Sequence, residues 1–131
     1  LSNFEPCQVD IGDGIVYHSS EAAFMAQKTD NMDHRRYLAT LTPSKAKAFG
    51  QTVDLRKDWD QYRVEAMINA VTAKFTQNSE LAKKLLETDN KYLEETNNWG
   101  DRFWGVVDGI GKNMLGHVLM EVRRSLQTPI E

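Results

Sequence analysis

The sequence predicts one domain of the α+β class, mainly helical, with a small β-hairpin near the N-terminus and several packed helices. Three observations lead to this prediction. Strand-like alternation of apolar residues is clearest near the start of the chain, helical spacing dominates the remainder, and no linker or repeat interrupts the series. At 131 residues the chain has the commonest size of a single domain. We therefore expect residues 1–131 to form one domain.

The N-terminal pattern predicts a hairpin followed by a helix. Four apolar residues alternate with polar or small residues on both sides of a Gly-Asp-Gly sequence, and these are Val9, Ile11, Ile15 and Tyr17. An Asp-Gly turn inside such alternation is typical of a β-hairpin. Ser19 and Glu21 then offer a cap and an acidic first turn, so we expect a helix that begins near Glu21 and runs through Lys28.

Three longer-range patterns predict the helices of the middle of the chain. Thr42 and Pro43 are suited to the cap and the first turn of a helix that ends at Gly50. The longest helical pattern starts at Asp58, and its apolar side consists of Trp59, Tyr62, Met67, Ala70, Val71 and Phe75. A further helix begins at residues 78–79 and stops near Thr88.

The last third of the chain is less regular. Residues 92–96 have the pattern of a short strand, and residues 97–111 are rich in Asn, Gly and Asp, as in a loop. Apolar residues at helical spacing from Leu115 onward then predict an amphipathic helix that ends near Thr128 and Pro129.

Composition excludes several classes of protein. The formal charge of −3, from 16 basic and 19 acidic residues, argues against a broad nucleic-acid surface. Cys7 is the only cysteine and the three histidines show no ligand spacing, so we expect no disulfide, no metal and no cofactor. No apolar run approaches the roughly 20 residues that span a bilayer, and no export signal is visible. We expect a cytoplasmic protein without a membrane partner.

The segment before the last helix has the most unusual local composition. Residues 101–105 and 108–113 are rich in Asp, Gly and aromatic residues. Gly109 and Gly111 directly precede a helix, where free backbone N–H groups can hold an anion such as phosphate, with Lys112 adding charge. The alternative is that both glycines only turn the chain into its last helix.

The tryptophans and one charged pair are further candidates. Trp99 and Trp104 lie in polar, glycine-rich surroundings, where an indole could stack on a base or sugar, whereas core anchoring is the alternative for Trp104 and for Trp59. An acidic residue such as Glu21 commonly only complements the dipole of its helix. Lys28, however, follows two helical turns later on nearly the same face, so that a carboxylate and an amine could act together.

Spaced motifs run along almost the whole sequence. The first half contains Leu1-Ser2-Asn3-Phe4-x-Pro6, Ser19-x-Glu21-x-x-Phe24-x-x-Gln27-Lys28, Pro43-x-x-Ala46-Lys47-x-x-Gly50 and Arg56-x-Asp58-Trp59. The second half contains Lys74-Phe75-x-Gln77-Asn78, Leu85-Leu86-x-Thr88, Leu93-x-Glu95, Asp101-x-x-Trp104-Gly105 and Gly111-x-Asn113-x-Leu115-Gly116. Together they resemble the NADAR family, also called YbiA-like.

The resemblance implies an N-glycosidase, a hydrolase of N-glycosyl bonds. Some family members act on phosphoribosylamino-pyrimidine intermediates of riboflavin synthesis, and others remove ADP-ribose from guanine bases. Carried over by motif, Glu21 is the leading catalytic carboxylate and Asp101 is a second acidic group. Lys28 is similar in position to a lysine that acts as nucleophile in guanine-directed members.

The resemblance also implies a set of ligand contacts. Trp59 and Trp104 would form walls of the pocket, and the Gly111-x-Asn113 turn would contact phosphate or ribose. Asn3 and Arg56 would complete the polar lining. The ligand would be a ribose phosphate or ADP-ribose, with transient contact to ADP-ribosylated nucleic acid.

Two routes fit this set of residues. A carboxylate can stabilise the oxocarbenium-like ribose while a base activates water, or a desolvated Lys28 can attack the anomeric carbon and form a Schiff base. Gln51 stands where family members often carry a basic residue, which affects substrate size. Residues 97–100 lengthen a loop, and because loops beside a site commonly set specificity, we expect an ADP-ribose-like substrate. A module that binds ADP-ribose without turnover, or an interaction scaffold, is the alternative.

Overall fold

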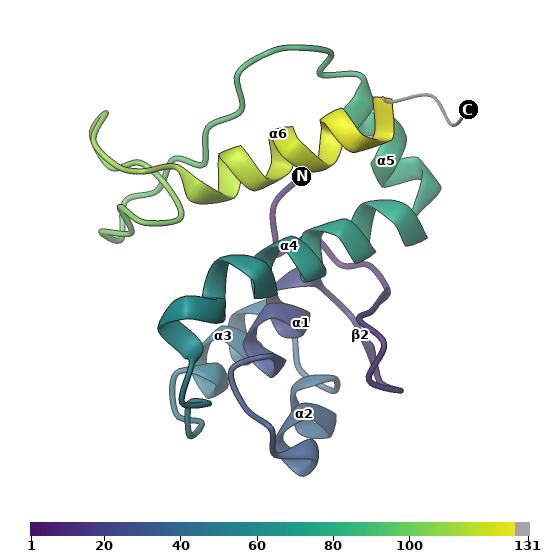
Figure 1. The fold of residues 1–131 in the computed structure, drawn as a ribbon, viewed down its shortest axis with the longest axis vertical. Helices are drawn as coiled ribbons and strands as arrows, with labels where there is room; N and C mark the ends of the chain where they lie inside the picture. Colours follow the sequence, from purple (N-terminus) through teal and green to yellow (C-terminus); the bar gives the residue numbers. More distant parts are fainter. Residues whose placement is uncertain (128–131) are drawn as a thin grey trace. The chain divides into compact units, whose positions relative to one another are not determined.

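The computed structural model describes residues 1–127, which contain six helices and one two-stranded antiparallel sheet (Figure 1). This composition confirms the predicted mainly helical α+β class. Residues 1–82 form one compact unit, and the chain from residue 83 onward forms another. That residues 1–131 act as one domain stays a prediction.

The predicted hairpin is present, with a longer connection than a two-residue turn. Strands β1 (Val9–Asp10) and β2 (Val16–Tyr17) pair antiparallel, with Val9 opposite Tyr17. Residues 11–15 connect them. The Asp10 carboxylate accepts the Gly12 N–H at 2.8 Å, and Gly12 has a φ of 92°, which glycine adopts without steric cost.

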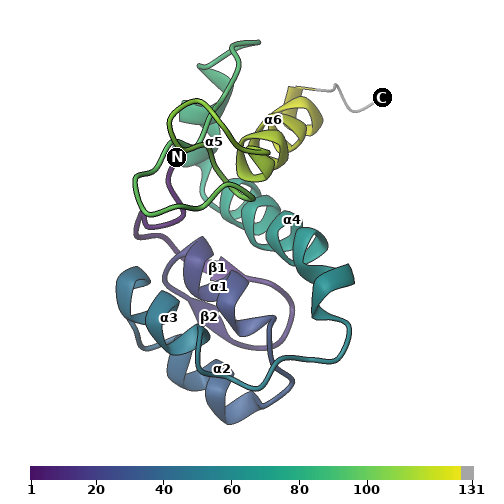
Figure 2. The same cartoon turned by 90° about the vertical axis from the view of Figure 1, so that its left-hand side faces the viewer.

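Helix α1 (Ser20–Ala26) lies at the centre of residues 1–82, and all seven of its residues are buried. Helices α2 (Met32–Leu38), α3 (Pro43–Gly50) and α4 (Trp59–Gln77) pack against it, and so does the hairpin (Figures 1 and 2). The Ser19 hydroxyl accepts the Ala22 N–H at 3.0 Å and caps the helix, as predicted.

The end of α1 differs from the prediction. The helix stops at Ala26, so Gln27 and Lys28 follow it in a turn. The N–H of Gln27 donates to Phe24 and that of Lys28 donates to Met25, which tightens the chain to three-residue spacing. The expectation that the helix includes Lys28 was therefore wrong.

Three of the remaining helices in this unit illustrate how local signals act. Thr42 caps α3 and Pro43 occupies its first turn, as predicted. The long helix begins at Trp59, close to the expected start. Helix α2 was not predicted as a helix, because Leu38 is its only buried residue; its N-terminus is capped by the Asn31 side chain, which accepts the N–H of Asp33.

Close contact between α1 and α3 depends on Gly50. A Cβ at this position would collide with the Met25 side chain. The glycine that the sequence indicated as a helix stop is therefore also the point of close approach between these helices.

Helix α5 (Ser79–Leu86) follows α4, and the C-terminal unit continues through a long irregular segment into α6 (Met114–Gln127). Figure 1 shows this segment running from α5 to the far end of α6, where it turns back into the helix. The predicted helix end at Thr128 and Pro129 lies outside the described residues.

The predicted strand at residues 92–96 was wrong. Only Thr96 pairs, in a single parallel bridge with Val106. The backbone before it is bonded elsewhere, because the N–H of Glu95 and the carbonyl of Leu93 both bind the Asn113 side chain. Residues 97–111 form the expected loop. Within residues 1–127, no helix is long and apolar enough to cross a membrane.

One buried ion pair connects the hairpin to α2. The Asp13 carboxylate accepts the Tyr17 hydroxyl at 2.7 Å and the Arg35 guanidinium at 3.2 Å. The side chains of Asp13 and Arg35 are only 11% and 13% exposed. Arg35 also donates to the Thr29 carbonyl at 2.9 Å, so these bonds join three segments of the unit.

We expect Asp13→Ala to lower the free energy of unfolding by about 2 to 4 kcal/mol, because it leaves the Arg35 charge and the Tyr17 hydroxyl without their acceptor. Urea denaturation measures this loss. Asp33→Ala is the control, since its ion pair with Arg36 is exposed and should matter little. Equal losses in the two variants would contradict the assigned role of Asp13.

Candidate functional site

Asn3 lies in a buried position at the start of α1. Its backbone carbonyl accepts the Glu21 N–H at 3.2 Å, and its side-chain oxygen accepts the Ser20 hydroxyl at 2.8 Å. Its amide nitrogen lies 3.3 Å from the Met67 sulfur. Asn3 therefore fixes the first turn of α1, and a contact between Asn3 and ligand stays a prediction.

A buried lysine that sequence reasoning did not single out as functional holds this N-terminal segment in place. Lys74 is fully buried on α4, where its amine donates to the Ser2 carbonyl at 2.7 Å and pairs with Glu5 at 3.3 Å. A signal was present in the sequence. Lys74 falls three residues after Val71 and seven after Met67, on the apolar side of the helix. A cation at such a position needs a buried partner.

Glu21 and Lys28 lie close enough in this unit to interact electrostatically. The Glu21 side chain is only 7% exposed, at the positive end of α1. Burial lowers the pKa of Lys28 below the usual range for lysine, and the negative charge of Glu21 opposes this shift. A buried carboxylate and a partly desolvated amine therefore interact through their charges in residues 1–82.

The surroundings of Lys28 are well defined. Its amine lies 3.5 Å from the Gly50 carbonyl oxygen and 5.9 Å from the centre of the Trp59 ring. Trp59 is 8% exposed and packs on Phe24, with ring centres 5.4 Å apart. Trp59 is therefore part of the core, as one of the two interpretations expected. That it also lines a ligand pocket stays a prediction.

Arg56 is already engaged by protein groups. Its guanidinium donates to both carboxylate oxygens of Asp58, at 2.6 and 3.1 Å, and lies 4.0 Å from the centre of the Tyr62 ring. Its backbone N–H donates to the Lys28 carbonyl at 2.8 Å. Arg56 therefore holds the backbone of Lys28.

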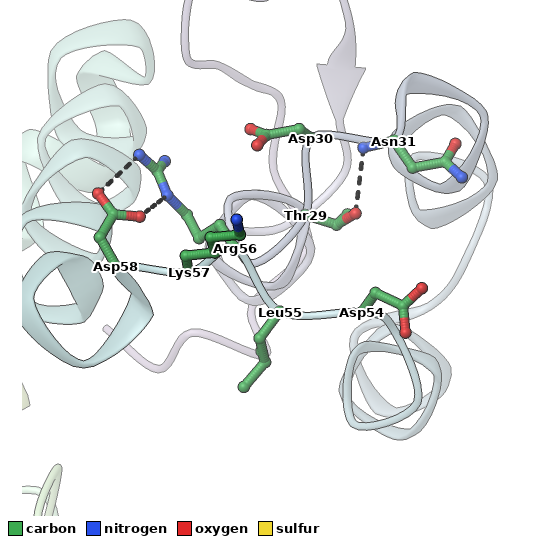
Figure 3. Close-up of a pocket in the computed structure, with 8 residues that line it drawn as sticks. All are labelled: Thr29, Asp30, Asn31, Asp54, Leu55, Arg56, Lys57 and Asp58. Atoms are coloured by element: carbon green, nitrogen blue, oxygen red, sulfur yellow. Dashed lines mark hydrogen bonds and ion pairs between the residues drawn. The ribbon is translucent and has the colours of Figure 1, made fainter.

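A hollow of about 510 Å³ adjoins this arginine (Figure 3). It is lined by two short segments, Thr29–Asn31 and Asp54–Asp58. Arg56 lines this hollow and Asn3 does not, so the polar lining that we expected from both residues is not found here. Two basic and three acidic side chains line it, and this balance disfavours phosphate.

In the C-terminal unit, Asp101 organises the loop in which it lies. One of its carboxylate oxygens accepts the N–H groups of Phe103 at 3.1 Å and Trp104 at 2.9 Å. The Asn97 side chain bonds both the N–H and the carbonyl of Asp101. These bonds are typical of a turn, and a catalytic role of Asp101 stays a prediction.

Four N–H groups at the start of α6 are bonded to protein carbonyls. Each of four successive N–H groups donates to a carbonyl of residues 102–105, at 2.8 to 3.3 Å, and the donors are Lys112, Asn113, Met114 and Leu115. These bonds support the alternative that the glycines turn the chain into its last helix, because the loop folds back onto the start of the helix. Gly111 permits this approach, since a Cβ there would lie 2.9 Å from the Val106 Cα. Contact between Gly111 and a ligand stays a prediction, and it has no support from the N–H groups of residues 112–115, which bond protein carbonyls.

Asn113 has a structural role that uses its whole amide. The side chain is 2% exposed; its oxygen accepts the Glu95 N–H at 2.9 Å, and its nitrogen donates to the Leu93 carbonyl at 2.8 Å and the Tyr92 hydroxyl at 3.1 Å. Both amide hydrogens are therefore used. A ligand that took them would have to break these bonds.

The tryptophans of this unit differ in exposure. Trp104 is partly buried and meets Phe103 edge to face, with ring centres 4.8 Å apart. Trp99 is 62% exposed. Stacking of either indole on a ligand stays a prediction. Among residues 1–127, no three His, Cys, Asp or Glu side chains gather in a way that could hold a metal ion.

Comparison with known proteins places these features in context. A family model, the NADAR domain, matches residues 1–127. The N-glycosidase YbiA of Escherichia coli is 37% identical over 131 residues, covering 96% of this chain and 80% of that protein. The solution structure of E. coli YbiA has a TM-score of 0.82 and 36% identity, covering 95% of this chain and 76% of that one.

A longer relative has a different name. A riboflavin biosynthesis protein of Vibrio vulnificus is 39% identical over 132 residues, which is 97% of this chain. The chain spans only about a third of that protein, 35% of its length. The similarity therefore concerns one part of a larger protein.

We expect Asn113→Ala to lower the free energy of unfolding by about 2 to 4 kcal/mol, because the Glu95 N–H and the Leu93 carbonyl lose their partner. Thermal and urea unfolding measure the loss. Asn98→Ala, an exposed change in the same unit, is the control. A variant that unfolds like the wild type but loses ligand affinity would instead assign Asn113 to ligand binding.

Proposed function

We propose that this chain, which belongs to the NADAR family and is an N-glycosidase, hydrolyses the C1′–N bond of a ribose-phosphate ligand and removes ADP-ribose from guanine bases. The observation that carries the proposal is the electrostatic interaction of buried Glu21 with partly desolvated Lys28. A protein that only bound ADP-ribose would need stacking and hydrogen-bonding groups but not this pair.

The pair supports a lysine route to bond cleavage. The neutral Lys28 amine attacks C1′ while the bond between C1′ and the base nitrogen breaks. The Glu21 carboxylate takes the proton that the attack leaves on the Lys28 nitrogen and passes it to the leaving base. The ribose ring opens to a Schiff base, and water then releases the sugar and regenerates the amine. The net reaction consumes one water and yields free base and free sugar phosphate.

Glu21 has two uses in this route. Its carboxylate stabilises positive charge that develops on the ribose, and it transfers protons to the leaving base and from water. Burial strengthens both effects, because water does not screen a side chain that is only 7% exposed. In the direct route, the same carboxylate or Asp101 would activate water without a covalent intermediate.

A second substrate has support from one relative. The similarity to a riboflavin biosynthesis protein of Vibrio vulnificus favours phosphoribosylamino-pyrimidines, which carry the same kind of C1′–N bond. Exposed Trp99 in the loop of residues 97–100 favours a ligand that extends beyond one ribose phosphate. We also predict that the protein contacts ADP-ribosylated nucleic acid transiently and that it lies in the cytoplasm.

We expect Glu21→Gln to abolish turnover while unfolding remains close to that of the wild type, because the change keeps the shape of the side chain and removes its charge. The assay incubates the protein with DNA that carries ADP-ribosylated guanine and, separately, with phosphoribosylamino-pyrimidines. Mass spectrometry follows release of the base or sugar. Glu80→Gln is the control, since Glu80 also lies in the first turn of a helix but is exposed.

Each outcome of this assay has a distinct meaning. Release from one substrate that vanishes only in Glu21→Gln identifies the substrate class and supports the catalytic role of Glu21. Ligand binding without release from either substrate would overturn the proposal in favour of a binding module. A large loss of stability in Glu21→Gln would instead assign Glu21 a structural role.

The lysine route predicts a characteristic pH dependence. Below its pKa Lys28 is protonated and cannot attack, so kcat should rise with pH and level off below the usual pKa range of lysine. Removing the Glu21 charge removes the influence that raises the pKa of Lys28, so any residual activity of Glu21→Gln should level off at lower pH.

Borohydride trapping tests the covalent step directly. Reduction during turnover should leave a sugar adduct on Lys28, detectable by mass spectrometry, and Lys28→Met should lack both adduct and activity. Lys45→Met, an exposed change on α3, is the control. Full activity of Lys28→Met without an adduct would contradict the lysine route and favour direct attack by water.

A further inference from the structure

Gln27, directly before Lys28, is the most highly bonded side chain near the proposed reactive pair. It is 3% exposed. Its amide nitrogen donates to the Ala23 carbonyl in α1 at 3.1 Å and to the Ala66 carbonyl in α4 at 2.9 Å. Its amide oxygen accepts the Asn69 side chain at 3.1 Å. Both amide hydrogens are used, one at the end of α1 and one in the middle of α4.

These bonds supply a partner for a backbone carbonyl that the early end of α1 leaves without one. A helix end has carbonyls without partners in the helix, and the Gln27 side chain satisfies that of Ala23. The bond to Ala66 then connects the turn of Gln27 and Lys28 to α4, the helix that also carries Trp59. On the other side of the turn, the Arg56 N–H holds the Lys28 carbonyl at 2.8 Å.

The Lys28 amine is located by what surrounds it. In residues 1–82, the amine lies near the Gly50 carbonyl from α3 and the Trp59 ring from α4, and the charge of the Glu21 carboxylate from α1 acts on it. Its backbone must therefore stay in place relative to three helices. A flexible lysine side chain reaches one position reproducibly only if its own backbone is held.

We propose that Gln27 is a positioning residue, which fixes Lys28 against α4 through its bonds to Ala23, Ala66 and Asn69 and so keeps the Lys28 amine beside Glu21 and Trp59. The proposal rests on the proposed lysine route for its effect on catalysis. Its effect on the surroundings of Lys28 can be measured independently of activity.

The test compares Gln27→Met with Gln77→Met. Methionine has a similar length but cannot donate to the two carbonyls. Gln77 is the matched control, because it is also a glutamine of this unit whose side chain makes hydrogen bonds to the backbone of another element. Its amide accepts the Asp10 N–H at 2.8 Å and donates to the Asp10 carbonyl at 2.7 Å. It belongs to the hairpin contact and not to the reactive pair.

We expect Gln27→Met to lower kcat by about 10-fold to 100-fold with KM changed by no more than about twofold, since misplacement of a reacting group acts on the chemical step. The Lys28 amine should also become better hydrated. Its pKa should then rise towards the ordinary lysine value, and the rise of kcat with pH should move to higher pH. Gln77→Met should change neither kcat nor the pKa of Lys28.

The pKa of Lys28 is measured by carbon-13 NMR titration of the lysine ε-carbons, with the signal assigned by Lys28→Met. The proposal would be overturned if Gln27→Met only lowered stability, while its kcat and the pKa of its Lys28 equalled those of Gln77→Met. Should Gln27→Met fail to fold, Asn69→Ala removes one of its partners and should shift the titration in the same direction by less; no shift would overturn the proposal.

The two proposals fail in different ways. If Lys28→Met keeps full activity, the lysine route is wrong, and the NMR titration alone then decides whether Gln27 positions Lys28. If Lys28→Met is inactive but Gln27→Met leaves both kcat and the titration unchanged, the lysine route stands and the positioning role of Gln27 is wrong.

Discussion

The complete burial of α1 is the constraint on which the arrangement of residues 1–82 depends. All seven residues of this helix are buried, and they include Ser20 and Glu21, whose polar groups must find hydrogen-bond partners or a compensating electric field. Asn3 supplies bonds to both residues at the start of the helix, and Gln27 supplies them at its end.

This constraint also explains why the reactive pair lies where it does. A carboxylate at the positive end of a buried helix recovers from the helix dipole part of what it loses in hydration. An early helix end lets Lys28 leave the helix and bring its amine to the same surroundings, next to Trp59 and Gly50. The chemistry that we propose therefore follows from how the two ends of one helix are satisfied.

The residues from the family motifs divide into groups with different physical roles. Asp101 uses its side-chain hydrogen bonds on backbone groups of its own unit, and Asn113 bonds two backbone groups and the Tyr92 hydroxyl of that unit. Arg56 is neutralised by Asp58 and holds the Lys28 backbone. Glu21 and Lys28, in contrast, combine burial with mutual electrostatic influence. A residue that recurs in a motif can thus serve the fold, and only its contacts separate this role from a chemical one.

The sequence by itself determined the elements whose signals are local. Helical spacing and the residues at the helix ends predicted α3 and α4 because caps and apolar stripes act over a few residues, and alternation predicted the hairpin. The tertiary structure decided the rest: the early end of α1, the lost strand at residues 92–96, the use of the N–H groups before α6, and the burial of Lys74. Lys74, the backbone around Leu93 and the Gln27 side chain bond partners that are 18 or more residues away, and the N–H groups before α6 bond a loop that folds back on them. The spacing of residue types along the chain carries no record of such bonds.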